Sequence, residues 1–298
     1  MSGDVAVAEA GQAPSRNRIL ARFLRNRPGI VALMVVVIVV LAAIFAPYIA
    51  PYDPDQQFFD GLTLEGMPLP PNARFPLGTD LLGRDLLSRL IYGARVSLII
   101  GVVANGTALA IGAVLGTVAG YLRGRVGQII MRITDLMMAF PALILAIALA
   151  AILRPSMWIV ALVIALVNWV WIARVVHSQV LSLAEQEFIT AAVAVGASRS
   201  RVFFRHLLPH LVPTLIVWGT LGIASSVLLE ASLSFLGVGV QPPTPSWGGI
   251  INESQSYFLD APWLVAFPGA AILVTSLAFN LLGDGLRDAL EPDRTGEL

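Results

Sequence analysis

The sequence predicts an all-α protein that crosses a membrane six times. Of its 298 residues, 57% are hydrophobic and 13% are charged, whereas a soluble domain carries about a quarter charged residues. The apolar residues gather in six runs, each close to the roughly 20 residues that a helix needs to cross a bilayer. The predicted spans are residues 30–50, 96–120, 133–153, 157–175, 211–236 and 263–283.

The segment before the first span, residues 1–29, is expected to be a tail that starts disordered and ends in a basic run. The apolar run that follows it is long, and no small-residue cleavage site precedes a soluble chain, so a cleaved signal peptide is not expected. The basic run holds Arg16, Arg18, Arg22, Arg25 and Arg27.

Residues 30–95 are expected to contain the first span and the longest polar loop. The first half of this loop is rich in Pro, Asp and Gly, which predicts an irregular structure. In residues 85–95, the apolar side chains share one helical face, while Asp85, Ser88 and Arg89 share another. This pattern predicts a short helix that lies in the membrane interface.

Residues 96–286 form the predicted core of the membrane domain. Its first span carries a small residue at every fourth position, which lets two helix backbones approach closely in lipid. Packing within the chain is the favoured interpretation, and contact with a second subunit is the alternative. The small residues are Ala104, Ala108, Gly112, Gly116 and Gly120.

Two acidic residues lie in or near the later spans. Asp135, near the start of the third span, suits the positive end of a helix dipole. Glu230 lies within the apolar run of the fifth span, where an acid costs about 2.5–3.5 kcal/mol. We therefore expect Glu230 to face protein or a water-filled path. A packing or gating role near the outer end of the span is favoured, and a proton or substrate site is the alternative.

A polar insert, residues 187–209, separates the fourth and fifth spans. Phe188 begins a set of apolar residues at helical spacing. Gly196 suits a left-handed helix end, and Ser198 can cap a second helix. Pro209 is expected to end that helix before the next span. The insert therefore predicts a helix pair that docks on another protein.

The arginines segregate to one side of the six-span topology, which predicts that both termini and the 187–209 insert are cytoplasmic. The tail at 287–298 lies on this side, whereas the loop at 237–262 has no basic residue and is expected outside. The 51–95 loop holds four arginines and six acids, and the same topology places it outside as well.

Motifs for chemistry are absent from the sequence. There is no GxxxxGK[ST] phosphate-binding loop, so this chain cannot bind ATP in that way. The three histidines, His177, His206 and His210, lack paired carboxylates on a shared face, and cysteine is absent. We therefore expect no catalytic residue, no metal site, no cofactor in this chain and no nucleic-acid partner.

Four stretches resemble the ABC-importer permeases, and in particular the second, C-type permease of the dipeptide, oligopeptide and nickel branch. They include GTDLLGRDLLSRLIYGAR at 78–95 and the regions 230–248 and 280–292. The fourth, at 187–209, is similar to the cytoplasmic EAA loop of that family, with Thr190 where the family often has glutamate.

The resemblance implies a type I permease fold in the cell inner membrane, with a coupling loop that fits a cleft of an ATPase subunit. The candidate coupling residues are Glu187, Thr190, Ala191, Ala192, Gly196, Ala197, Ser198, Phe203, Leu208 and Pro209.

The resemblance also implies the partners and the function. They are a homologous permease, two ATPase subunits that bind ATP and Mg, an extracytoplasmic binding protein and the lipid bilayer. The chain would form half of an import pathway for dipeptides, oligopeptides, glutathione or nickel chelates. Two interpretations from other classes stay open: a proton-coupled secondary transporter that uses Glu230, and a membrane scaffold without transport.

Overall fold

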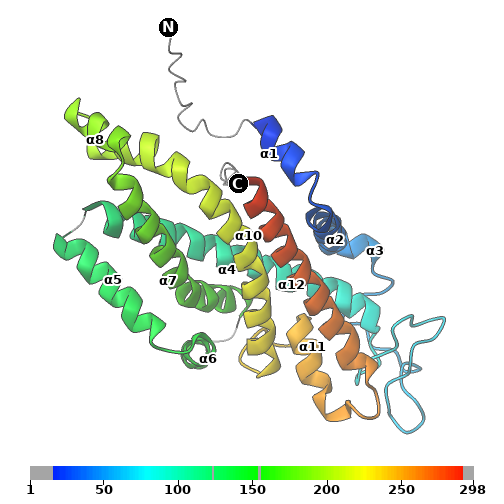
Figure 1. Cartoon of the computed structure of the whole chain (residues 1–298). Coiled ribbons are helices and arrows are strands. Elements are labelled where there is room, and N and C mark those ends of the chain that lie inside the picture. Colours follow the sequence, from blue (N-terminus) through cyan, green and yellow to red (C-terminus); the bar gives the residue numbers. More distant parts are fainter. Residues whose placement is uncertain (1–15, 123, 154–155, 291–298) are drawn as a thin grey trace.

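The structure is a computed structural model that describes residues 16–122, 124–153 and 156–290 (Figure 1). Regular structure in this part of the chain is helical, and β-pairing is limited to isolated bridges within the 51–85 loop. Five helices are long and apolar enough to cross a membrane, or six spans if one bent helix pair is counted as a span. The all-α, polytopic fold class predicted from the sequence is therefore confirmed.

The first helices are α1 (Arg16–Phe23), α2 (Arg27–Ile44) and α3 (Ala46–Ile49). The basic run thus forms a helix of its own, and the disordered start expected at residues 1–15 lies outside the described residues. The Asn26 side chain accepts a hydrogen bond from the amide of Gly29, and proline stands in the first turn of α2. Both features favour the start of a helix.

The next span, α4 (Leu86–Leu122), is a single helix of 37 residues. The predicted short interfacial helix at 85–95 is therefore wrong, because these residues form the first turns of the span itself. Asp85, Ser88 and Arg89 are buried rather than turned toward a membrane surface. Arg89 pairs with Glu253, and the Ser88 hydroxyl accepts a hydrogen bond from the amide of Tyr52, whereas Asp85 accepts hydrogen bonds from Ser88 itself. Sequence periodicity alone does not show the two distant partners.

The predicted third span at 133–153 is broken. It consists of α5 (Gly124–Met138) and α6 (Ala142–Ile152), which meet at an angle of 91°. Pro141 precedes α6 and has extended backbone angles; proline also disfavours helical geometry at the residue before it. The apolar run is therefore continuous in sequence but not as a helix. Arg154 and Pro155, between the predicted third and fourth spans, lie outside the described residues.

The fourth span, α7 (Met157–Ala184), leads into α8 (Glu187–Ala194) and α9 (Arg199–Val202). A π-helical turn (Phe203–Leu207) then joins α9 to α10 (Leu208–Phe235). The prediction that Pro209 ends a helix is wrong, because the helical path from residue 199 to 235 is continuous. The amide of Leu208 bonds to the carbonyl of Phe203, five residues back, and Pro209 stands in the first turn of α10, where its missing N–H is tolerated.

The chain closes with α11 (Trp247–Ser254), a 3-10 turn (Gln255–Tyr257) and α12 (Trp263–Leu290). The segment 237–262 thus holds a short helix rather than only a loop. Because α12 extends to Leu290, the predicted tail at 287–298 begins within a helix.

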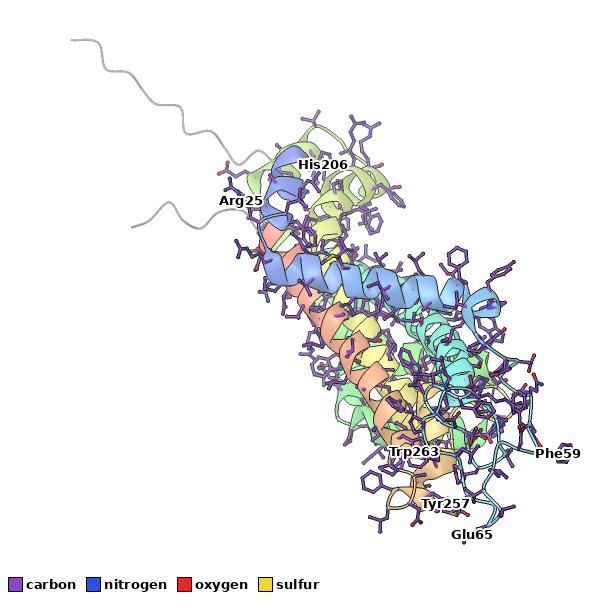
Figure 2. All side chains as sticks on the ribbon, turned by 90° about the vertical axis from the view of Figure 1, so that its right-hand side faces the viewer. Arg25, Phe59, Glu65, His206, Tyr257 and Trp263 are labelled. Atoms are coloured by element: carbon purple, nitrogen blue, oxygen red, sulfur yellow. The ribbon has the colours of Figure 1, made fainter. Side chains whose placement is uncertain are left out.

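The two ends of the molecule hold different segments. Arg25 and His206 lie at one end, and Phe59, Glu65 and Tyr257 lie at the other (Figure 2). The helix α8 is therefore far from α11 and the 51–85 loop, as Figure 1 also shows. The arginine distribution predicts that these two ends face opposite sides of the membrane.

Candidate functional site

The 187–209 insert forms a compact helix pair at one end of the molecule. Gly196 has a φ of 88° between α8 and α9, which is the left-handed conformation that glycine adopts without strain. The Ser198 side chain accepts a hydrogen bond from the amide of Arg201 and so caps α9. The predicted conformation of Gly196 and the predicted cap are both confirmed.

One face of the insert is anchored in the protein. Ile189, Val202 and Leu207 are buried in an apolar cluster that includes Val176 and Val180 of α7. In addition, the ring of Phe188 stacks on a histidine at the start of α10, with ring centroids 5.1 Å apart. The insert is therefore fixed to α7 and α10, and its movement would be transmitted to them.

The opposite face of the insert is open. Val195 is 90% exposed and Phe204 is 64% exposed, and Val193 is also exposed. A large exposed apolar surface on an ordered element indicates contact with another protein or with lipid. Of the predicted coupling residues, the structure leaves Glu187, Thr190, Ala191, Gly196, Ser198 and Pro209 exposed, and it half-buries Ala192, Ala197, Phe203 and Leu208.

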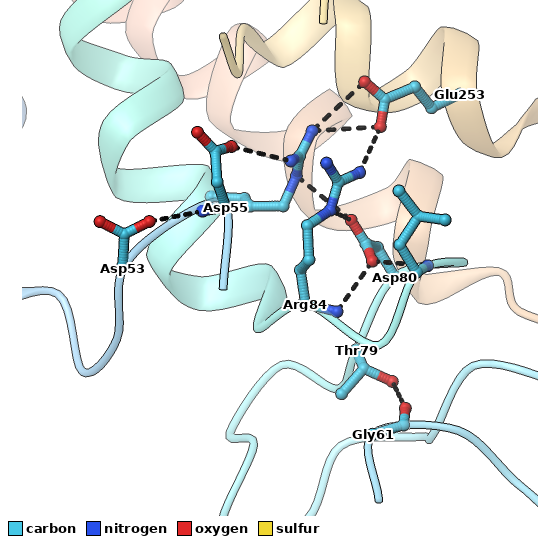
Figure 3. Close-up of polar contacts among 9 residues, drawn as sticks. Asp53, Asp55, Gly61, Thr79, Asp80, Arg84 and Glu253 are labelled. Carbon is cyan, nitrogen blue, oxygen red and sulfur yellow. Dashed lines mark hydrogen bonds and ion pairs between the residues drawn. The ribbon is translucent and has the colours of Figure 1, made fainter. Parts of the chain in front are cut away.

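A second polar site, which the sequence pattern does not predict, lies at the other end of the molecule, the end that the arginine distribution predicts to be outside. This outer ion-pair cluster consists of Asp55, Asp80, Arg84, Arg89 and Glu253 (Figure 3). Arg84 Nε lies 2.6 Å from Asp80 Oδ2, and its Nη2 lies 2.8 Å from Glu253 Oε2. Arg89 Nη2 lies 3.1 Å from the same Glu253 oxygen, and its Nε lies 3.3 Å from Asp80 Oδ2.

The outer ion-pair cluster joins the 51–85 loop and the start of α4 to α11. Both arginines are almost completely buried, so their charges depend on the surrounding carboxylates. Glu253 stands in a segment without basic residues, and that isolation was the one sequence signal of a distant partner. The arginine-containing string at 78–95 therefore has a structural role in holding the outer face together.

Glu230 is completely buried where α4, α10 and α11 meet. The Ser97 hydroxyl donates to Glu230 Oε2 at 2.8 Å, and the Ser234 hydroxyl donates to Oε1 at 2.7 Å. The amide of Trp247, at the start of α11, lies 3.5 Å from the Ser97 oxygen. Glu230 therefore faces protein, as expected, and packs three helices together; its role in gating stays a prediction.

The small residues of α4 pack against α7 of the same chain. A Cβ atom at Gly112 would lie 2.7 Å from the Trp169 carbonyl oxygen, and one at Gly116 would lie 2.5 Å from that of Ala173. Ala104, Ala108 and Gly120 likewise lie against α7. The interpretation as intrachain packing is therefore confirmed, and these positions are not available as a seam with a second subunit.

The prediction that Asp135 stands near the start of a helix is wrong, because Asp135 lies in the last turn of α5. Asp135 forms an ion pair with Arg174, which joins α5 to α7. Among the described residues, no group of three or more His, Cys, Asp or Glu side chains is placed to hold a metal ion.

These features define a class of protein: a polytopic, all-helical membrane protein with a partly exposed apolar helix pair at one end and a buried ion-pair cluster at the other. Comparison with known proteins specifies the class. The sequence model of the binding-protein-dependent transport system inner membrane component matches residues 112–296. That of the N-terminal TM domain of oligopeptide transport permease C matches residues 16–71. The chain belongs to the family of binding-protein-dependent transport system inner membrane components.

Two relatives agree with this assignment, and a solved structure shares the fold. The chain is 44% identical to the di/tripeptide transport system permease protein DppC of Pseudomonas aeruginosa, covering 91% of this chain and 89% of the relative. It is also 44% identical to the glutathione transport system permease protein GsiD of Escherichia coli, covering 92% and 89%. The inward-facing MetNI methionine ABC transporter matches with a TM-score of 0.58 and 18% identity, over 68% of this chain and 96% of that one. This last likeness shows the fold.

Proposed function

We propose that this chain is the permease subunit of an ATP-driven importer for short peptides and related solutes such as glutathione. The names of the DppC and GsiD relatives support this substrate class. Family membership favours import through a multi-subunit complex over a proton-coupled secondary transporter and over a scaffold.

One observation carries the mechanism. The 187–209 helix pair is anchored on one face by Ile189, Val202 and Leu207 and leaves apolar side chains exposed on the other. This is the form that a mechanical coupling element requires, because a partner can push the exposed face and the anchored face passes the movement on. The partner that we propose for the exposed face is an ATPase subunit, which would hold the ATP and Mg.

The path from the coupling element to the outer face is continuous. The helix that begins at Arg199 runs without interruption to Phe235 and carries Glu230 near its far end. Glu230 in turn contacts α4, and through Ser97 the start of α11. Closure of two ATPases would therefore shift the population between arrangements of α10 that differ at the outer face.

The remaining partners that we propose are those that membership of the family favours. A homologous permease would provide the other half of the pathway, and an extracytoplasmic binding protein would deliver the substrate to the end that holds α11. The orientation proposed for the membrane places both termini and the 187–209 helix pair in the cytoplasm.

The test is a pair of matched glycine variants. Gly196 and Gly66 both have positive φ angles, 88° and 78°, and a Cβ atom at either would meet nothing within 4 Å. A valine at either position therefore costs roughly 1–2 kcal/mol of local backbone strain. We expect Gly196→Val to misdirect α9, to abolish peptide uptake and to reduce copurification of the ATPases, while the level of protein in the membrane stays near wild type.

Gly66→Val is the control, because it places the same strain at the opposite end of the molecule. It should leave uptake and ATPase binding within about twofold of wild type, since its strain stays within a loop. Normal transport by a Gly196→Val protein with its ATPases bound would remove the 187–209 segment from the mechanism. Equal loss in both variants would show that general backbone strain, and not coupling, is responsible.

A further inference from the structure

The short helix α1 has two different faces. Phe23 is buried, and Ile19 packs with it against the core cluster that includes Ala289 of α12. Leu20 and Leu24, in contrast, are each 58% exposed. Phe23 and Ile19 already hold this segment against the core, so Leu20 and Leu24 are not needed for packing within the chain.

The same segment carries a concentrated positive charge. Five arginines occur within residues 16–27, and no acidic residue occurs from residue 10 to residue 52. The side chains of Arg25 and Arg27 are exposed, and Arg25 lies at the outer surface of this end of the molecule (Figure 2).

The neighbouring helix, α12, reduces the net positive charge of this segment only slightly. On α12, Asp284, Arg287 and Asp288 are exposed, so the two acids are partly offset by an arginine. Asp288 accepts a hydrogen bond from Asn26 Nδ2 at 3.2 Å. The segment therefore keeps a net positive charge when α12 is included.

The position of this segment relative to the membrane is fixed by its connection to the first span. The Asn26 side chain caps α2 and at the same time bonds to α12. Gly285 of α12 lies close to Gly29 at the first turn of α2. The segment is thus held where α2 begins, and the apolar outer face of α2 continues from it through Val31 and Ile38, which are both exposed.

We propose that α1 and residues 24–27 form a membrane-surface anchor that binds anionic phospholipid. The arginines would bind the headgroups, and Leu20 and Leu24 would enter the boundary between headgroups and acyl chains. An amphipathic helix with a basic and an apolar outer surface binds such a membrane by both effects. Lipid is favoured over a protein partner because the exposed leucines precede a span whose own outer face is apolar. The anchor would fix the cytoplasmic end of α12, independently of the coupling element.

The experiment uses the full chain, which has no cysteine. Ala21, which is exposed, is replaced by cysteine and labelled with the environment-sensitive dye NBD. The protein is placed in phosphatidylcholine nanodiscs with increasing amounts of phosphatidylglycerol. We expect the emission to shift to the blue as phosphatidylglycerol is added, and the shift to weaken at high salt because the attraction is screened.

Two charge variants distinguish a specific anchor from general attraction. Arg25→Gln with Arg27→Gln should weaken binding about 25-fold, and so abolish the shift or confine it to the highest phosphatidylglycerol fractions, since each arginine near the surface contributes on the order of fivefold in binding. Arg199→Gln with Arg201→Gln removes the same charge from exposed residues of α9 and should leave the half-maximal fraction unchanged.

Three results would overturn the proposal. Emission that is independent of phosphatidylglycerol would show that the segment does not contact anionic lipid. An equal effect of the two arginine pairs would show only non-specific attraction. A blue shift that requires added ATPase subunits and not phosphatidylglycerol would assign the surface to a protein partner. None of these results depends on whether the chain transports peptides.

Discussion

Replacement of Gly116 by alanine should destabilise the membrane domain, whereas replacement of Gly106 on the same helix should not. A Cβ atom at Gly116 would lie 2.5 Å from the Ala173 carbonyl oxygen and 2.9 Å from the Val176 Cβ atom of α7. A Cβ atom at Gly106 would meet nothing within 4 Å. The two positions thus differ in their surroundings, while both lie in the interior of α4.

The expected magnitude follows from two opposing effects. Alanine is favoured over glycine in a helix interior by about 0.5–1 kcal/mol, and this gain applies at both positions. At Gly116 alone, the helices must separate by several tenths of an ångström, and overpacking of this kind costs about 1–3 kcal/mol. Because the helix preference cancels in the comparison, Gly116→Ala should be less stable than Gly106→Ala by about 1–3 kcal/mol.

Reversible unfolding in mixed detergent micelles, with increasing sodium dodecyl sulfate, measures this difference in the free energy of unfolding. The two variants should express and insert alike, since neither changes hydrophobicity by more than a methyl group. Unfolding free energies that agree within about 0.5 kcal/mol, the usual scatter of such comparisons, would refute the assignment of the small-residue face to contact with α7.

Two other results are expected. Glu253→Ala leaves two buried arginines without their shared carboxylate and should lower the unfolding free energy by about 1–3 kcal/mol. This is below the full cost of a broken buried pair, because the Glu253 side chain is 26% exposed. Asp60→Ala breaks an exposed pair with Arg74 and should lower the unfolding free energy by less than about 1 kcal/mol, so equal losses in the two variants would contradict the importance of burial. Membrane-impermeant maleimide should label Ser256→Cys from outside the cell and Ser200→Cys only after permeabilisation, since both sites are exposed; the reverse pattern would invert the proposed topology.

Composition and apolar runs predicted the helical class because the length of a span is set by the bilayer and not by tertiary contacts. The turn at Gly196 and the cap at Ser198 were also predictable, since both depend on local backbone geometry. These features need no knowledge of the rest of the fold.

The errors have a common cause. Pro209 is expected to end a helix, because proline has no N–H group to donate. The helix continues, because a π-helical turn precedes Pro209 and places it in the first turn of α10, where the missing N–H is tolerated. The polar face that includes Arg89 was assigned to a membrane surface because its partner, Glu253, is far away in sequence. In each case, the local sequence pattern does not show how a polar group is satisfied: the backbone near Pro209 by a π-helical turn, and the Arg89 side chain by a distant carboxylate.

The outer ion-pair cluster can be completed only late in the synthesis of the chain. Arg89 and Glu253 are separated by 164 residues, so at a synthesis rate of about 5–20 residues per second the carboxylate arrives roughly 10–30 s after the arginine. During this interval, of the three carboxylates of the cluster, Asp55 and Asp80 have been made and Glu253 has not. The outer face can therefore close only after α10, which belongs to the fourth helix long enough to span the membrane, has been made. Arrest of translation before Glu253 should yield a nascent chain whose 51–85 loop is open to proteolysis.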